Sequence, residues 1–201
     1  MTSDAASSRF DATFSSPRPV LETARLLMRP FLETDACDIE RLAGDSHVAQ
    51  MLLAMPHPYP VGAAVQWIAK HEELWNARRE LPLAITRRDR QGALAGAISL
   101  HFVLDHQHAE VGYWIAHGSW GDGIASEATA AVLHWAFVEL GLHRVFARHM
   151  VTNPASGAVM RKNGMRHEGT LREHHWKHGR PHDFHVYGIL RSEYLAMDGY
   201  P

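Results

Sequence analysis

A glycine-rich turn is the feature that most restricts the fold of this chain. The turn runs from Trp120 to Ser126 and reads Trp-Gly-Asp-Gly-Ile-Ala-Ser. Before it, Glu110–Ile115 alternates as a strand does, and after it a segment from about Ile124 to Leu140 has an apolar stripe at helical spacing. A helix start has unpaired N–H groups and a partial positive charge, and glycine lets a phosphate approach the backbone closely. The sequence therefore predicts a site for a phosphate-bearing ligand at this turn.

Two common phosphate-binding motifs do not fit this turn. It lacks the third glycine of the dinucleotide-binding fingerprint and the Gly-Lys-Ser/Thr of the nucleoside triphosphate loop. The same glycines would also suit a tight connection that binds nothing. The turn alone therefore leaves open whether it binds a ligand.

The elements around the turn indicate the fold class. Leu83–Thr86 and Ala93–Phe102 are predicted to form a hairpin, and His143–Val151 a later strand. Asn153 to Gly164 is predicted to be a short helix, with Asn at its cap and Pro at its first position. A closing hairpin turns near Gly179, and its second strand is Phe184–Leu190. This order predicts an α+β domain of three α/β/α layers with a mostly antiparallel mixed sheet.

The chain is predicted to form one domain over residues 20–201. Residues 1–19 are rich in Ser, Ala, Asp and Pro without a sustained period, which predicts a flexible tail. Arg25–Phe31 is the expected first strand, followed by a helix from Asp35 that Gly44 ends. Apolar residues recur at helical spacing from Val61 to Trp75.

Composition excludes several function classes. The net charge of −2 argues against nucleic acid as the main ligand. The single cysteine, Cys37, forms no intramolecular disulfide and favours a reducing, cytoplasmic location. No apolar run approaches the ~18 residues of a membrane span, and no secretory apolar region is expected at the N-terminus. The 16 histidines do not by themselves select a function.

Several motifs together resemble the GCN5-related N-acetyltransferase (GNAT) superfamily, and most closely its branch of ribosomal-protein alanine N-acetyltransferases. They are Gly112-Tyr113-Trp114-Ile115, the turn with Glu127-Ala128 after it, Asn153-Pro154-Ala155-Ser156 and Lys162-Asn163-Gly164-Met165. The resemblance extends from about Leu21 to Leu190. It implies a sheet of about six or seven strands flanked by about four helices, splayed between the fourth and fifth strands.

The resemblance also implies acetyl-CoA, or another acyl-CoA, as the cofactor. The family pattern maps onto Trp120, Gly123 and Ala125, and Trp120 departs from the usual Gln or Arg. Backbone N–H groups would bind the pyrophosphate, and the gap between the splayed strands would hold pantetheine. The implied cofactor-binding residues are Trp114, Ile115, Trp120, Gly121, Asp122, Gly123, Ile124, Ala125, Ser126, Asn153 and Ser156.

Two residues are the candidates for catalysis. In this family a neutral amine attacks the thioester directly, and the resemblance places a base or a water-orienting acid near Glu110. Ser156 is the candidate for protonating the thiolate, because Met160 stands where many relatives carry a tyrosine. A surface role for Glu110 and a capping role for Ser156 remain alternatives. The histidines at positions 101, 108 and 149 are alternative bases, since their intrinsic pKa suits neutral pH.

The expected partners are acyl-CoA and an amine acceptor, with no nucleic acid, membrane or metal. The acceptor is a protein N-terminal amine, or else a polyamine or an antibiotic amine. A succinyl-type acyl group, a non-catalytic acyl-CoA-binding module, and a homodimer or higher homo-oligomer stay open. Five C-terminal histidines suggest a metal site, but no cysteine accompanies them, so a surface or substrate-cleft role is favoured. They are His174, His175, His178, His182 and His185.

Overall fold

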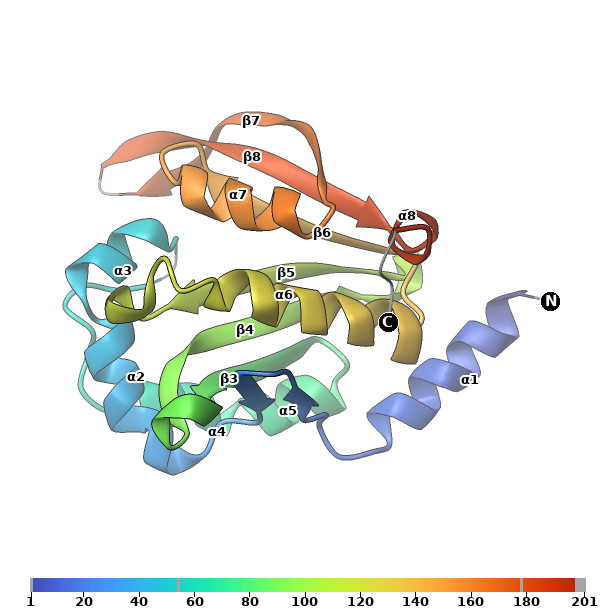
Figure 1. Cartoon of the computed structure of the whole chain (residues 1–201), viewed down its shortest axis with the longest axis horizontal. Coiled ribbons are helices and arrows are strands. Elements are labelled where there is room, and N and C mark those ends of the chain that lie inside the picture. The colour runs from blue at the N-terminus through green and yellow to red at the C-terminus, as the bar shows by residue number, and fades with distance from the viewer. Residues whose placement is uncertain (1, 54, 178, 198–201) are drawn as a thin grey trace.

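A single mixed β-sheet forms the centre of the molecule (Figure 1). The computed structural model describes residues 2–53, 55–177 and 179–197. The strand order is β1-β2-β3-β4-β5-β6-β8-β7, and neighbours are antiparallel except for the parallel pair β5 and β6. The strands are β1 Leu21–Glu22, β2 Leu26–Arg29, β3 Glu80–Arg87, β4 Ala93–Val103, β5 His108–Ile115, β6 Arg144–Met150, β7 Arg166–Lys177 and β8 Arg180–Leu190.

Helices cover both faces of this sheet. They are α1 Thr2–Phe14, α2 Ala36–Ala43, α3 Ser46–Met51, α4 Ala63–Ala69, α5 His71–Asn76, α6 Ile124–His134, α7 Pro154–Lys162 and α8 Arg191–Leu195. Figure 1 shows α6 and α7 across the near face, where they contact each other. The α+β class with a mostly antiparallel mixed sheet is therefore confirmed, although the described residues form eight strands. The additional edge strand β1 has only two residues, too few to show a period.

The two core clusters follow from the alternation of side chains along the strands. Val111 and Ile115 of β5 pack in the larger cluster with Ala128 and Val132 of α6. Trp114 has the opposite alternation along β5. Its side chain points to the other face of the sheet and packs in the smaller cluster with Ile39 of α2. Successive strand residues face opposite sides of a sheet, so one strand supports both layers. The alternation predicted for Glu110–Ile115 is confirmed.

The first nineteen residues contain more structure than composition indicates. The sequence predicts a flexible tail there, whereas Thr2–Phe14 forms the helix α1. Phe10 and Phe14 are buried in the larger core cluster, and the Phe14 ring lies 4.6 Å from that of Trp75. Their spacing of four residues puts both rings on one helix face, a signal that is easily missed in a polar segment. The domain boundary at residue 20 stays a prediction.

Two predicted helices are subdivided in the structure. The helical spacing between Val61 and Trp75 belongs to two short helices, α4 and α5, that meet at Lys70. The long helix predicted after the turn is α6, which continues through a π-helical segment at Trp135–Glu139. Within the part of the chain that the structure describes, no helix is both long and apolar enough to cross a bilayer.

Strands β5 and β6 pair only briefly before they part. Their parallel register covers His108–Glu110 against Arg144–Phe146. Beyond these pairs, Val111–Ile115 is bonded to β4 alone and Ala147–Met150 to β8 alone. The facing edges of β5 and β6 therefore present backbone N–H and C=O groups that no neighbouring strand pairs. The predicted splay is confirmed. It is expected between the fourth and fifth strands, which are β5 and β6 here because the short strand β1 precedes the strands that the sequence predicts.

A buried histidine makes this fold sensitive to acid. His71 is 1% exposed and packs against the rings of Phe31 and Trp67, whose centroids are 5.5 and 4.3 Å away. Neither imidazole nitrogen has a hydrogen-bond partner among the described residues. Burial, with the charge of Arg18 adding to it, lowers the pKa of His71 to about 4. The imidazole is therefore neutral at pH 7.

Replacing this imidazole should reduce the acid sensitivity. The unfolded chain binds a proton at His71 near pH 6.5 and the folded chain only near pH 4, so the free energy of unfolding falls as pH drops through this window. From pH 7 to 4.5 we expect His71 to account for roughly 2–3 kcal/mol of that fall. Urea denaturation at both pH values should show a smaller loss in His71→Phe than in the wild type or in His101→Phe, which changes an exposed histidine. Equal losses in all three proteins would contradict this account.

Candidate active site

The glycine-rich turn has the geometry that an anion needs. Gly121 and Gly123 both adopt left-handed conformations, with φ of 81° and 79°. Gly123 is the N-cap of α6 and supplies no side chain to cap it. The N–H groups of Ile124, Ala125 and Ser126 precede the first helical hydrogen bond, Glu127 N to Gly123 O. No acceptor bonds them in the described residues, so they stay available to a ligand.

Two arginines hold the turn from the side of β2 and β3. The Asp122 carboxylate accepts a 2.6 Å bond from Arg87, whose guanidinium also donates to both oxygens of Asp89. The Asp122 carbonyl accepts a 3.0 Å bond from Arg25, which pairs through its Nε with Glu127 in the first turn of α6. Asp122 thus fixes the backbone that connects the two glycines. The structure gives Asp122 a supporting role through its side chain, while its N–H can still face a ligand.

Trp120 ties the turn to the end of the splayed strand. Its indole Nε1 donates a 2.8 Å hydrogen bond to the Ile115 carbonyl, and 43% of the residue is exposed. The indole therefore occupies one of the backbone acceptors at the end of β5. It provides a neutral donor and an apolar surface in place of the cationic or amide side chain usual in the resembled pattern. Trp114 is buried in the smaller core cluster, so only its backbone can contact a ligand.

These features fit an acyl-CoA. The diphosphate requires clustered N–H donors, which the start of α6 supplies. The amide-containing arm requires unpaired backbone groups, which the separated edges of β5 and β6 supply. Both sites are continuous in the chain, since β5 leads into the turn through residues 116–119. The proposed cofactor-binding residues from Trp114 to Ser126 are thus brought together, although their contacts with the cofactor stay a prediction.

The start of α7 joins this strand through a pair of hydroxyl groups. Asn153 caps the helix, and its Oδ1 accepts a 3.3 Å bond from the backbone N–H of Ser156. The Ser156 Oγ lies 2.8 Å from the Tyr113 hydroxyl of β5. Burial raises the pKa of Tyr113 to about 12, so that hydroxyl stays protonated at neutral pH. The cap does not use the Ser156 hydroxyl, whose hydrogen-bond partner is the Tyr113 hydroxyl.

Glu110 lies at the point where β5 and β6 separate. It is the last β5 residue in register with β6, opposite Phe146. Both of its carboxylate oxygens accept 2.8 Å hydrogen bonds from Arg148 of β6. The Arg148 guanidinium also lies 2.9 Å from His174 Nε2. A carboxylate whose two oxygens are both bonded by one guanidinium is held in a fixed orientation, which suits positioning of a neighbouring group.

The alternative histidine bases lie in different surroundings. His149 is 6% exposed beneath α7, where a side chain at Gly157 would meet its Nε2 at 2.7 Å. Burial lowers the pKa of His149, and its Nδ1 lies 2.8 Å from the Met150 carbonyl. His101 lies near the end of β4 and His108 at the start of β5, where His101 contacts Ser99 and His108 packs on Phe146. The packing of His149 favours a structural role.

The C-terminal histidines do not gather as metal ligands in the described residues. His174 contacts Arg148, His182 contacts the Lys177 carbonyl, and His185 contacts Thr170. His178 lies outside the described residues. Among residues 2–53, 55–177 and 179–197, a group able to hold an ion occurs elsewhere, at Asp45, His47 and His117. The expectation of no metal stays a prediction.

Two contacts of this site were not anticipated from the sequence. Arg87 and Arg88 are adjacent charged residues of the kind that usually lie in solvent, yet Arg87 is 8% exposed and holds the turn. Tyr113 lies in the strand predicted over Glu110–Ile115, and its partner Ser156 is distant in the chain. The alternation of side chains along β5 indicates which face of the sheet Tyr113 is on, but only the tertiary fold brings α7 to that face. Neither partner could be read from local spacing.

The chain is similar in sequence and in structure to known acetyltransferases. The family described as Acetyltransferase (GNAT) domain matches residues 25–166. The uncharacterized N-acetyltransferase YoaA of Bacillus subtilis (strain 168) is 32% identical over 174 residues, which cover 86% of this chain and 97% of that protein. The putative ribosomal N-acetyltransferase YdaF of the same organism is 38% identical over 104 residues, 51% of this chain and 57% of that protein. A GNAT-family acetyltransferase from Bacillus anthracis has a similar crystal structure, with a TM-score of 0.77, 25% identity and coverage of 87% and 99% of the two chains.

A substitution in the turn should separate cofactor binding from folding. In Gly123→Asp, a carboxylate enters beside the free N–H groups of α6 and repels a diphosphate, so the Kd for coenzyme A should rise at least about tenfold. Gly62→Asp is the matched control, because Gly62 caps α4 with nearly the same φ of 80°. Calorimetric titration measures both values. An unchanged Kd in Gly123→Asp, or an equal rise in Gly62→Asp, would show that the turn does not bind the diphosphate.

Proposed function

The chain belongs to the GNAT acetyltransferase family, and we propose that it transfers an acetyl group from acetyl-CoA to a primary amine, preferentially a protein N-terminal amine. Membership rests on the family match over residues 25–166 and on the relative that is similar over 86% of the chain. The chain is thus an acyl-CoA-dependent acetyltransferase. The identity of the acyl group and of the acceptor belongs to the proposal.

The separation of β5 from β6 is the observation that carries this proposal. It leaves unpaired backbone groups next to a helix start whose N–H groups are also free. When bound, acetyl-CoA supplies an acyl group that a neutral amine can accept without a covalent enzyme intermediate. The protein residues then have to bind the cofactor, hold the amine and manage protons. Backbone groups do the binding, which explains why Trp120 can replace a polar side chain at that position.

Ser156 is the proposed proton donor for the departing thiolate. Its hydroxyl can donate outward while accepting from Tyr113, whose own hydroxyl stays protonated. Met160 provides no proton at the position where many relatives carry a tyrosine, and it is buried in the core. Tyr113 is then a positioning residue, because it fixes the Ser156 side chain from the neighbouring strand. In a chain of hydrogen bonds each bond polarises the next, so the bond from Tyr113 also strengthens the bond that Ser156 donates.

At the fork, the point where β5 and β6 separate, Glu110 is proposed to orient a water molecule or the acceptor amine. It is not proposed to remove a proton. Arg148 donates to both of its carboxylate oxygens, and His174 lies against the Arg148 guanidinium. A charged carboxylate at this point also favours the approach of an ammonium group before it loses its proton. The ammonium loses one proton to solvent before it attacks the thioester. The nitrogen loses a second proton as the C–S bond breaks, and this proton restores the Ser156 O–H that has protonated the thiolate.

A protein N-terminus is favoured as the acceptor by the similarity to a putative ribosomal N-acetyltransferase. That match covers 57% of the relative. The competing acceptor classes are polyamines and antibiotic amines. Release of the coenzyme A thiol in the presence of each amine class, compared with its slow release in water, tests the whole proposal.

Ser156→Ala should lower the rate without preventing cofactor binding. Removing a general acid typically costs about 100-fold in kcat, whereas KM for acetyl-CoA should stay within about threefold. The helix cap remains, because it uses the Ser156 backbone N–H. Thiol release with a peptide amine measures both constants, and Ser99→Ala is the control for losing a hydroxyl from a neighbouring strand. An unchanged kcat in Ser156→Ala would reduce Ser156 to a structural residue.

Glu110→Gln distinguishes an orienting carboxylate from a base. An orienting role predicts a kcat lower by roughly tenfold at every pH, with the acidic limb of the pH–rate profile in its original place. Loss of that limb would instead identify Glu110 as the base. The double variant Glu110→Gln/Arg148→Gln removes the unpaired guanidinium that the single variant leaves. If it restores full activity, Glu110 serves only to neutralise Arg148.

A further inference from the structure

We infer that the pocket between α3 and the β7–β8 hairpin selects acceptor amines that carry a carboxylate, as the N-terminus of an acidic peptide does. The inference rests on the proposed function, and it specifies the substrate class that the same site prefers. Two observations carry it. The residues that line the pocket are positively charged or neutral, and of its two permanent cations Lys177 is bonded within the protein while the Arg180 guanidinium has no partner in the described part of the chain.

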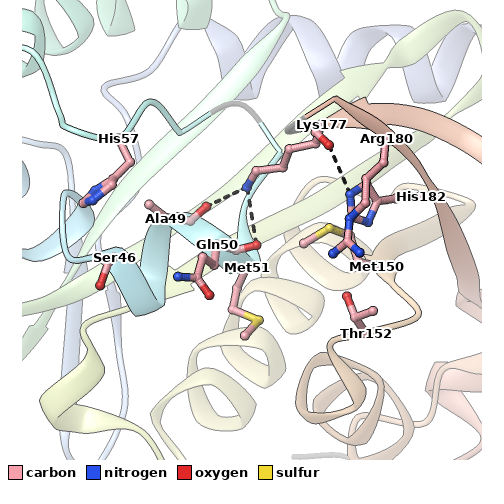
Figure 2. Close-up of a pocket in the computed structure, with 10 residues that line it drawn as sticks. All are labelled: Ser46, Ala49, Gln50, Met51, His57, Met150, Thr152, Lys177, Arg180 and His182. Carbon is pink, nitrogen blue, oxygen red and sulfur yellow. Dashed lines mark hydrogen bonds between the residues drawn. The ribbon is translucent and has the colours of Figure 1, made fainter.

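The pocket lies where an acceptor could reach the proposed reaction site. It has a volume of about 440 Å³ and is walled by α3, by the end of β6 and by the β7–β8 hairpin (Figure 2). Thr152 lines it and directly precedes Asn153, the cap of α7. One wall of the pocket is therefore continuous in the chain with the N-terminus of the helix that carries Ser156. Met51 and Met150 supply apolar surface for the rest of an acceptor chain.

The lining of this pocket is positive. Four of its residues are cations or can become cations, and none of the described lining residues is an aspartate or a glutamate. The four are His57, Lys177, Arg180 and His182. An acceptor with several ammonium groups, such as a polyamine, would find no carboxylate to pair with here. An acceptor with a carboxylate would find a complementary charge.

Lys177 uses its charge to build the pocket. Its ammonium donates a 2.7 Å bond to the Ala49 carbonyl and also bonds the carbonyls of Gln50 and Leu52, at the C-terminal end of α3. Figure 2 shows the side chain extended from the hairpin across to α3. Lys177 is 8% exposed, so it is a structural connection between two walls. A cation at a helix C-terminus is favourably placed, and its charge is largely satisfied there.

Arg180 is the cation that remains for a ligand. Its side chain is exposed, and among the described residues its guanidinium makes no ion pair or hydrogen bond. Figure 2 places its guanidinium beside Met150 and above Thr152, on the pocket side of the hairpin. A guanidinium presents a planar pair of donors that matches a carboxylate in a bidentate arrangement. Arg180 is therefore the proposed specificity residue, and the half-buried His182 lies next to it.

Matched peptides test this preference. Two hexapeptides would share a Ser N-terminus and differ only at positions two and three, which are Asp-Glu in one and Lys-Lys in the other, with spermidine as a third acceptor. We expect kcat/KM for the acidic peptide to exceed that for the basic peptide at least tenfold. Arg180→Gln should reduce this ratio to near one, and Arg180→Glu should invert it. The Kd for coenzyme A should stay unchanged in both variants.

Arg172→Gln is the matched control, because Arg172 is an exposed arginine of β7 outside the pocket. Its peptide ratio should equal that of the wild type. Equal turnover of the two peptides, or a preference for spermidine, would overturn the charge preference while leaving the acetyltransferase proposal intact. Coenzyme A binding without turnover of any amine would overturn both. Thermal unfolding of each variant identifies any loss of fold.

Discussion

The short parallel register between β5 and β6 is the constraint on which the rest of the site depends. Three residue pairs hold the strands together, and the chain then sends β5 toward α6 and β6 toward α7. Parallel strands that stay paired would bury their backbone groups and leave no opening. Because these strands part, each keeps an edge that its outer neighbour does not use. The candidate site is thus built largely from main chain, which side-chain substitution cannot easily remove.

Charged side chains hold together the segments that surround this opening. Glu110 and Arg148 form a bidentate pair across the two strands at the fork. Arg87 and Arg25 hold the turn through the Asp122 carboxylate and carbonyl, between the two glycines with positive φ. On the acceptor side, Lys177 fastens the hairpin to α3. Each pair links segments that are distant in the sequence, and together they make a rigid frame around an opening.

The sequence could predict those parts of the fold that depend on local chemistry. Alternation in Glu110–Ile115, the two glycines of the turn and the Asn-Pro start of α7 each follow from rules that act over a few residues. The fork itself came from the family resemblance. Contacts such as Tyr113 with Ser156 or Lys177 with Ala49 join residues 43 and 128 positions apart, and no local pattern encodes them. The buried face of α1 was missed because two phenylalanines are a weak signal in a polar segment.

Hydrogen exchange with and without coenzyme A tests the central claim that the opening between β5 and β6 binds the cofactor. Unpaired amides exchange quickly until a ligand bonds them. The account predicts that coenzyme A slows exchange in peptides covering residues 111–126 and 147–156. A second groove of about 890 Å³ lies on the outer side of α6, between Leu21 and Lys162. Protection confined to residues 19–23 and 130–139, with residues 111–126 unchanged, would contradict the account.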